Sequence, residues 1–157
     1  AAEIRKSKWE WFDLNDKTWT VPAEDYKTGR TIRRALPDVA IRLLNEHKRG
    51  SATKHVLTPA QFRDKEDIPP GQTLVSTYSA QVIRKTGMKE WSLHDLRRTV
   101  ATRLSELGAP PHVIEKLLGH QMSGVMARYN LHDYMGDQHE WLTIWQHHLQ
   151  DIIGYPL

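Results

Sequence analysis

The sequence predicts an α+β fold that is mainly α-helical, with a small N-terminal antiparallel β-hairpin or three-stranded sheet packed on a helical core. Residues 9–36 are rich in aromatic and β-branched residues and carry turn-forming residues at 15–17 and 27–30. From residue 37 onward, apolar residues recur at three- and four-residue steps, which is the spacing of amphipathic helices. At 157 residues, the chain is long enough for one domain with a substantial core.

The N-terminal part is predicted to begin with the end of a helix, in residues 1–6. Because neither a capping residue nor an initiator Met precedes this segment, we expect the chain to be a fragment of a longer protein. Residues 9–14 are predicted to form a short strand and residues 18–22 a second one. The glycine turn at 27–30 then leads into a returning strand at residues 31–36.

Helices are predicted along the rest of the chain. Proline at position 37 suits a first helical turn, and residues 51–72, which contain Pro59 and a Pro-Pro-Gly sequence, predict a surface loop. The last helix would be capped by Asp133 or Asp137. The expected helices are residues 37–50, 73–85, 92–107, 112–118 and a last one reaching residue 152.

The helix at 92–107 has the clearest pattern. Ser92 is a good N-cap, and Asp95 three residues later approximates a capping box. His94 and Arg97 project from the first turn, where backbone N–H groups and cationic side chains together suit an anion such as phosphate. Solvated surface residues would give the same pattern, so this helix alone leaves the phosphate site open. Its apolar stripe is Leu93, Leu96, Val100, Leu104 and Leu107.

Composition excludes several classes of protein. There is no cysteine, so disulfides and thiolate metal sites are excluded, and no segment has the roughly 20 apolar residues of a membrane span. The net charge of +3 is a mild bias toward polyanions. The histidines show no clear metal-ligand spacing, so we expect neither metal nor cofactor. The basic residues gather in two clusters: Lys27, Arg30, Arg33 and Arg34, and then Arg97, Arg98 and Arg103.

Three motifs occur in order along the second half of the chain. These are His94-Asp-Leu-Arg97, Leu117-Leu-Gly-His120, and Tyr129 nine residues after His120. Together with the lysine-bearing hairpin at Lys27, they resemble the catalytic domain of the tyrosine recombinases, with the closest likeness to phage- or prophage-type integrases. The resemblance extends from residue 1 to about residue 134. It implies that residues 1–157 form the catalytic domain, with 135–157 as a C-terminal helical tail.

This resemblance implies a reaction and a role for each residue. Tyr129 would be the nucleophile, attacking the scissile phosphate to form a 3′-phosphotyrosyl link and release a 5′-hydroxyl. His94 and Arg97 would stabilise the charge on the non-bridging oxygens, and His120 would add a donor or position the tyrosine. Lys27 would be the general acid that protonates the leaving oxygen. The overall function would be site-specific recombination that integrates or excises a mobile element.

The resemblance also implies partners and a missing residue. Double-stranded DNA would be the substrate, the full-length protein would form a homotetramer on DNA, and it would act in the cytoplasm of a bacterial host without membrane contact. The family's second arginine lies three residues before the glutamate that Glu3 resembles, which is one position before Ala1. The N-terminal DNA-binding domain of the family is absent as well. We therefore expect this chain alone to bind DNA weakly and to recombine nothing.

Other interpretations remain open at this point. Residues 104–118 could be the helix-turn-helix of a non-enzymatic DNA-binding module, although this leaves Lys27, His120 and Tyr129 without a role. A type IB topoisomerase-like strand cleavage shares much of the chemistry. The tryptophans of the last helix could also indicate an interaction protein, and Tyr134 competes with Tyr129 as the nucleophile.

Overall fold

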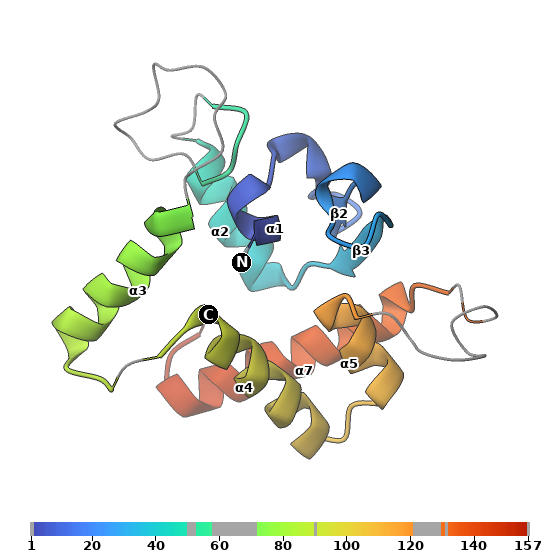
Figure 1. The fold of residues 1–157 in the computed structure, drawn as a ribbon. Helices are drawn as coiled ribbons and strands as arrows, with labels where there is room; N and C mark the ends of the chain where they lie inside the picture. Colours follow the sequence, from blue (N-terminus) through green and yellow to red (C-terminus); the bar gives the residue numbers. More distant parts are fainter. Residues whose placement is uncertain are drawn as a thin grey trace.

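The computed structural model describes residues 2–49, 53–57, 72–89, 91–120, 130 and 132–156. Figure 1 shows the small sheet with α1 and α2 in one half of the molecule, and α4, α5 and α7 in the other. Helices predominate and the three strands are short, so the predicted α+β, mainly helical fold class is confirmed.

The strands form one antiparallel sheet in the order β1-β2-β3. They are β1 (Phe12–Asp13), β2 (Thr18–Val21) and β3 (Ile32–Ala35). Of the two predicted alternatives, the structure has the three-stranded sheet. The first strand is shorter than predicted because residues Trp9–Trp11 form a 3₁₀ turn, η1, which brings the ring of Trp11 into the core.

The connection between β2 and β3 is anchored in this core. The 3₁₀ turn η2 (Ala23–Asp25) follows β2, and the ring of Tyr26 then packs with Trp11 and Val21. Residues 27–31 are exposed, and Gly29 adopts a left-handed conformation with φ of +64°. The exposed turn that carries Lys27 is therefore held to the sheet at the buried Tyr26.

The helices lie close to their predicted positions. Of the predicted loop at 51–72, the structure describes residues 53–57, where the backbone N–H groups of Trp9 and Val56 donate to the carbonyls of Lys54 and Ser7 at 3.0 and 2.9 Å. No described helix is both long and apolar enough to cross a membrane. The helices are α1 (Ala2–Lys6), α2 (Asp38–Lys48), α3 (Gln72–Thr86), α4 (Leu93–Glu106), α5 (Pro111–Leu118) and α7 (Met135–Ile153).

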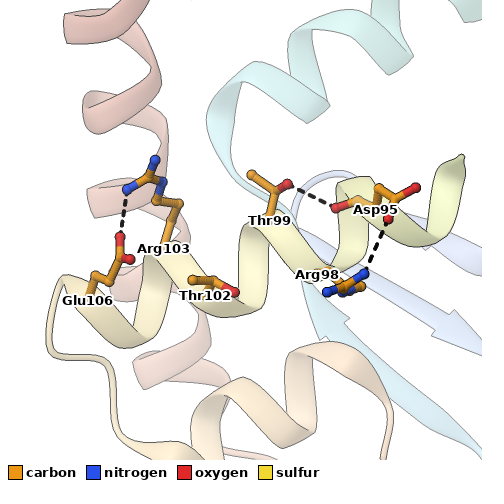
Figure 2. Close-up of a pocket in the computed structure, with 6 residues that line it drawn as sticks. All are labelled: Asp95, Arg98, Thr99, Thr102, Arg103 and Glu106. Atoms are coloured by element: carbon orange, nitrogen blue, oxygen red, sulfur yellow. Dashed lines mark hydrogen bonds and ion pairs between the residues drawn. The ribbon is translucent and has the colours of Figure 1, made fainter. Parts of the chain in front are cut away.

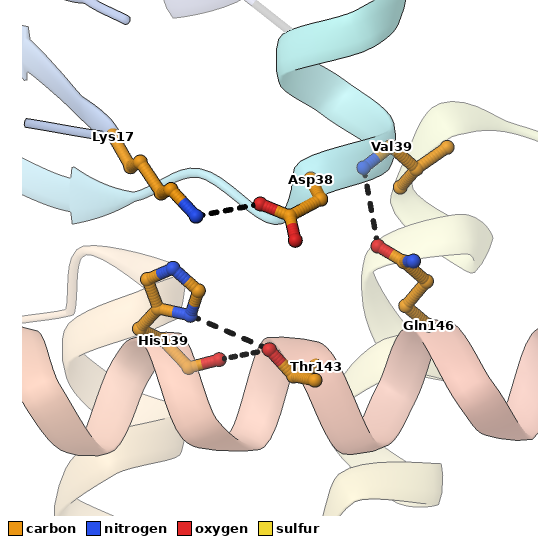
Figure 3. A network of polar contacts seen from close by, with 6 residues as sticks. All are labelled: Lys17, Asp38, Val39, His139, Thr143 and Gln146. Atoms are coloured by element: carbon orange, nitrogen blue, oxygen red, sulfur yellow. Dashed lines mark hydrogen bonds and ion pairs between the residues drawn. The ribbon is translucent and has the colours of Figure 1, made fainter. Parts of the chain in front are cut away.

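Helix α7 packs on its own chain and joins the two halves. Trp141 and Trp145 pack on a buried cluster of Leu104, Ala109 and Ile114 from α4, α5 and the segment between them. The α7 side chains also reach the other half by hydrogen bonds. The Gln138 amide oxygen accepts from the Ala35 N–H at 3.2 Å, and that of Gln146 accepts from the Val39 N–H at 3.1 Å. Figure 3 shows the second contact beside the Lys17–Asp38 ion pair.

The predicted cap of this helix is wrong. The N-cap is Tyr134, in a left-handed conformation with φ of +54°, and no side chain caps the helix. Asp133 instead pairs with Arg33 at 3.7 Å and offers its backbone carbonyl to the amide nitrogen of Gln138 at 2.7 Å. Asp137 lies inside the first turn, where its charge favours the positive end of the helix dipole.

Candidate active site

The N-terminus of α4 is capped as predicted. The Ser92 hydroxyl accepts from the Asp95 N–H at 3.4 Å, while the Asp95 carboxylate accepts from the Ser92 N–H at 3.0 Å. The Ser92 hydroxyl also donates to the Asp95 carboxylate at 2.8 Å, and this bond together with the one from the Ser92 N–H holds the pKa of Asp95 below its ordinary value. A carboxylate of the chain therefore already occupies part of the helix end. An anion bound there would depend on the side chains of the first turn more than on free backbone N–H groups.

The apolar stripe of α4 is buried only in part. Leu104 is fully buried and Val100 packs beside it, whereas Leu93 and Leu96 are 36% and 51% exposed. These two leucines instead line a pocket of about 400 Å³. The N-terminal end of α4 therefore has an open apolar wall next to its cationic side chains. The pocket is lined by Glu3, Ile4, Trp19, Arg34, Leu93, His94, Leu96, Arg97, Val100 and Leu117.

His94 and Arg97 are thus brought together in one pocket. His94 is exposed, and Arg97 is half-buried with its Nη2 donating to the backbone carbonyl of Leu118 in α5. Within the described part of the chain, this is the one hydrogen-bond partner of the Arg97 guanidinium. A guanidinium has five N–H donors, so most of them are left for an anion while the bond to α5 fixes its position.

The pocket also contains a buried arginine that the sequence did not single out as a site residue. Arg34 of β3 is 7% exposed. Its Nη2 pairs with the Glu3 carboxylate at 2.9 Å, its Nε donates to the Leu117 carbonyl at 2.8 Å, and its guanidinium lies 5.1 Å from the Trp19 ring. Its Nη1 is buried without a hydrogen-bond partner among the described residues.

Three side chains, from the connection after η2, from β3 and from α4, hold the end of α5. Arg34, Arg97 and Tyr26 donate to the successive carbonyls of Leu117, Leu118 and Gly119, the last at 2.5 Å from the Tyr26 Oη. Helix ends normally leave such carbonyls without helical partners, so these contacts complete the hydrogen bonding of the helix as well as fixing its place.

Gly119 fits this position for two reasons. It adopts a left-handed conformation with φ of +68°, which favours glycine. In addition, a Cβ at this position would lie 2.7 Å from the Tyr26 Oη and closer still to the Arg34 Nη2. The backbone of α5 can therefore approach β3 this closely only without a side chain at residue 119.

His120 and Lys27 are tied to this helix end through their neighbours. His120 is exposed, and its Nδ1 lies 2.8 Å from the Glu115 carboxylate. Lys27 is exposed on the turn that begins at Tyr26. The predicted nucleophile, Tyr129, lies outside the described residues. The structure therefore places His94 and Arg97 in one pocket and connects the backbones that carry His120 and Lys27.

Tyr134, the alternative nucleophile, is enclosed by neighbouring polar and aromatic groups. Its hydroxyl accepts from the Asn130 amide at 2.7 Å, and its ring lies 4.5 Å from that of His112 and 4.7 Å from that of His132. These contacts hold the side chain of Tyr134 at the N-cap position of α7. Across the described ranges, no group of three or more His, Asp or Glu side chains could hold a metal ion.

The outer face of α4 has a different character. Figure 2 shows a pocket on this face lined by charged residues and threonines of α4 alone. Arg98 pairs with Asp95 at 3.6 Å, and Arg103 pairs with Glu106 at 2.7 Å. Two arginines of the predicted basic cluster are therefore balanced by acids of the same helix, while the third, Arg97, faces the pocket with His94.

A helix N-terminus carrying His and Arg, next to a fixed helix end followed by another His, can bind a phosphate group. The family model described as "Phage integrase family" matches residues 1–135. The chain belongs to the phage integrase family. This match covers the sheet, α4 and α5 of the integrase chain, and therefore the pocket and the helix end just described.

Individual relatives agree with this assignment. The integrase chain is 29% identical to prophage integrase IntA of Escherichia coli over 146 residues, which cover 92% of this chain and 34% of IntA. It is 29% identical to prophage integrase IntZ of the same organism, covering 99% of this chain and 38% of IntZ. With the integrase of Salmonella phage P22, the identity is 25% over 82% of this chain and 34% of the relative.

The chain spans little more than a third of the length of these curated relatives. No solved structure matches the chain significantly.

Proposed function

We propose that this chain is the catalytic domain of a site-specific recombinase that breaks and rejoins double-stranded DNA through a 3′-phosphotyrosyl intermediate. The observation that carries the proposal is the placement of His94 and Arg97 in one pocket, with Arg97 anchored to the helix end before His120. The names of the relatives, prophage and phage integrases, support the same reaction for this chain.

The proposed cleavage step is balanced without a metal or cofactor. The Tyr129 hydroxyl loses its proton to water as its oxygen forms a bond to the scissile phosphorus. The bond to the 5′-oxygen breaks, and Lys27 donates the proton that makes this oxygen a hydroxyl and is then reprotonated from water. Rejoining reverses these bonds when a 5′-hydroxyl of the partner strand attacks the phosphotyrosine. The energy of the phosphodiester is kept in the covalent link, so recombination needs no external energy source.

Arg97 and His94 would stabilise the charge that develops on the non-bridging oxygens. Preorganised donors are effective because they need no rearrangement when the charge forms. The bond from Arg97 to the Leu118 carbonyl supplies this preorganisation. For His120, the contact of Nδ1 with Glu115 leaves Nε2 as the nitrogen that can face the phosphate.

The proposal includes partners and a setting. We propose double-stranded DNA as the substrate, a homotetramer on DNA as the active assembly of the full-length protein, and the cytoplasm of a bacterial host as the location. The prophage and phage origin of the relatives supports the bacterial setting. Tetramer formation is tested by the size of the complex that the full-length protein forms with two recombination sites.

The nucleophile can be tested directly with the full-length protein and a nicked suicide substrate, from which the cleaved end diffuses away. We expect a covalent protein–DNA adduct on a denaturing gel, lost in Tyr129→Phe and retained in Tyr134→Phe as the matched control. DNA binding without an adduct in the wild type would favour the helix-turn-helix alternative. An adduct that disappears only in Tyr134→Phe would move the nucleophile to that residue.

A further inference from the structure

One hydrogen bond links the two parts of the chain that carry Lys27 and His120. The Tyr26 hydroxyl donates to the Gly119 carbonyl at 2.5 Å across 93 positions of sequence. Tyr26 directly precedes Lys27, and Gly119 directly precedes His120. The two residues therefore join the turn with the proposed general acid to the helix end with the proposed phosphate ligand.

Within the described part of the chain, the turn beyond Tyr26 has one backbone hydrogen bond, from the Gly29 N–H to the Tyr26 carbonyl at 2.9 Å, which ties it to Tyr26 itself. Residues 27–31 are exposed, and within the described part of the chain the Lys27 side chain has no ion pair or hydrogen bond. Tyr26 itself is only 5% exposed, with its ring packed against Trp11 and Val21. The ring thus fixes the turn to the sheet, and the hydroxyl is the group that fixes it to α5.

The α5 side of this bond is the more rigid partner. Arg34 and Arg97 hold the carbonyls of Leu117 and Leu118, and Ile114 is buried in the cluster under α7. Loss of the tyrosine hydroxyl would therefore release the exposed turn more than it would displace the end of the helix.

We propose that Tyr26 is a positioning residue for Lys27, holding the ammonium where it protonates the leaving 5′-oxygen. This inference rests on the proposed DNA cleavage reaction. Tyr26→Phe keeps the packed ring and removes the bond to α5. This substitution should slow the protonation of the leaving oxygen, while His94 and Arg97 still contact the non-bridging oxygens of the phosphate.

The test compares two suicide substrates with the full-length protein. One has the ordinary 5′-bridging oxygen at the scissile phosphate, and the other has sulfur there, which leaves without needing a proton. We expect Tyr26→Phe to cleave the oxygen substrate about tenfold more slowly, the rate equivalent of one hydrogen bond. On the sulfur substrate its rate should return to near the wild-type rate, as should that of Lys27→Ala.

A double variant and a matched control complete the design. Tyr26→Phe/Lys27→Ala should be no slower on the oxygen substrate than Lys27→Ala alone, because both changes affect the same step. Thr143→Val removes a hydroxyl that donates to the His139 carbonyl within α7 and, among the described residues, makes no bond to the turn or to the end of α5, so it should leave both rates unchanged (Figure 3).

The outcomes separate this inference from the proposed function. If the wild type forms no covalent adduct, the proposed function fails and this inference fails with it. If the wild type forms the adduct but Tyr26→Phe is unaffected, or is slow on both substrates alike, the inference alone is overturned. Equal slowing on both substrates would mean that the Tyr26 hydroxyl stabilises the fold or positions His120, because neither of these roles affects the protonation of the leaving oxygen.

Discussion

Replacing Gly119 by alanine tests the closeness of α5 to β3. In the left-handed conformation at φ of +68°, alanine lowers the free energy of unfolding by about 1–2 kcal/mol relative to glycine. Up to about 1 kcal/mol of this loss is offset, because alanine has less conformational entropy than glycine in the unfolded chain. The added Cβ would also push away the Tyr26 hydroxyl and the buried Arg34 guanidinium. Losing or stretching one neutral and one charged hydrogen bond costs roughly 2–4 kcal/mol more.

Gly154→Ala provides the matched control. Gly154 ends α7 in the same conformation, with φ of +69°, but a Cβ there meets no atom within 4 Å. Urea denaturation of the two variants should differ by about 2–4 kcal/mol, and the melting temperatures should differ by roughly 2–4 °C for each kcal/mol. Equal losses in the two variants would refute the close approach of β3 to residue 119.

Two further predictions concern α4. Arg97→Ala should abolish adduct formation on the suicide substrate yet lower the unfolding free energy by no more than about 1.5–3 kcal/mol, the value of one hydrogen bond from a charged group; a larger loss of stability would make Arg97 mainly structural. Because the pKa of Asp95 is lower in the folded state than in the unfolded state, its ionised carboxylate stabilises the folded state. This stabilisation is fully present above the unfolded-state pKa near 3.8 and is lost as the pH falls through the lower folded-state pKa. The stability difference between wild type and Ser92→Ala should therefore shrink from pH 7 to pH 3, measured by urea denaturation followed by circular dichroism; a constant difference would contradict the capping-box account.

Local patterns were sufficient to predict most of the elements. The bounds of α4 follow from Ser92 at its start and Gly108 after its end, because capping and the left-handed stop depend only on nearby residues. The same holds for the strands around the glycine turn. The prediction that His94 and Arg97 project from the same end of α4 also needed only the helical repeat, whereas the pocket that both line was not predicted.

The contacts that complete the candidate site could not be predicted in this way. Arg34 reaches the Leu117 carbonyl across 83 positions, and Tyr26 reaches Gly119 across 93. Periodicity shows which face of a strand is buried, but not which backbone carbonyl a buried polar group will meet. In the sequence, Arg34 was therefore one of several basic residues, and Tyr26 was only the residue before Lys27.

The predicted cap of α7 was wrong for a related reason. Asp133 had the right residue type for a cap, but its carbonyl accepts from Gln138 five residues later and its carboxylate pairs with the distant Arg33. A buried glutamine that is 0% exposed needs partners for its amide, and meeting this need takes precedence over a local cap.

The contacts of α7 also impose an order on folding. The N–H groups of Ala35 and Val39 donate to Gln138 and Gln146, which are synthesised 103 and 107 residues later. Contacts this distant in sequence form late, because a long loop must close before they contribute. During synthesis, the N–H groups of Ala35 and Val39 would therefore stay bonded to water until α7 has been made. The link that α7 makes between the two halves is therefore added last, after the contacts of Tyr26 and Arg34 with the end of α5 can already form.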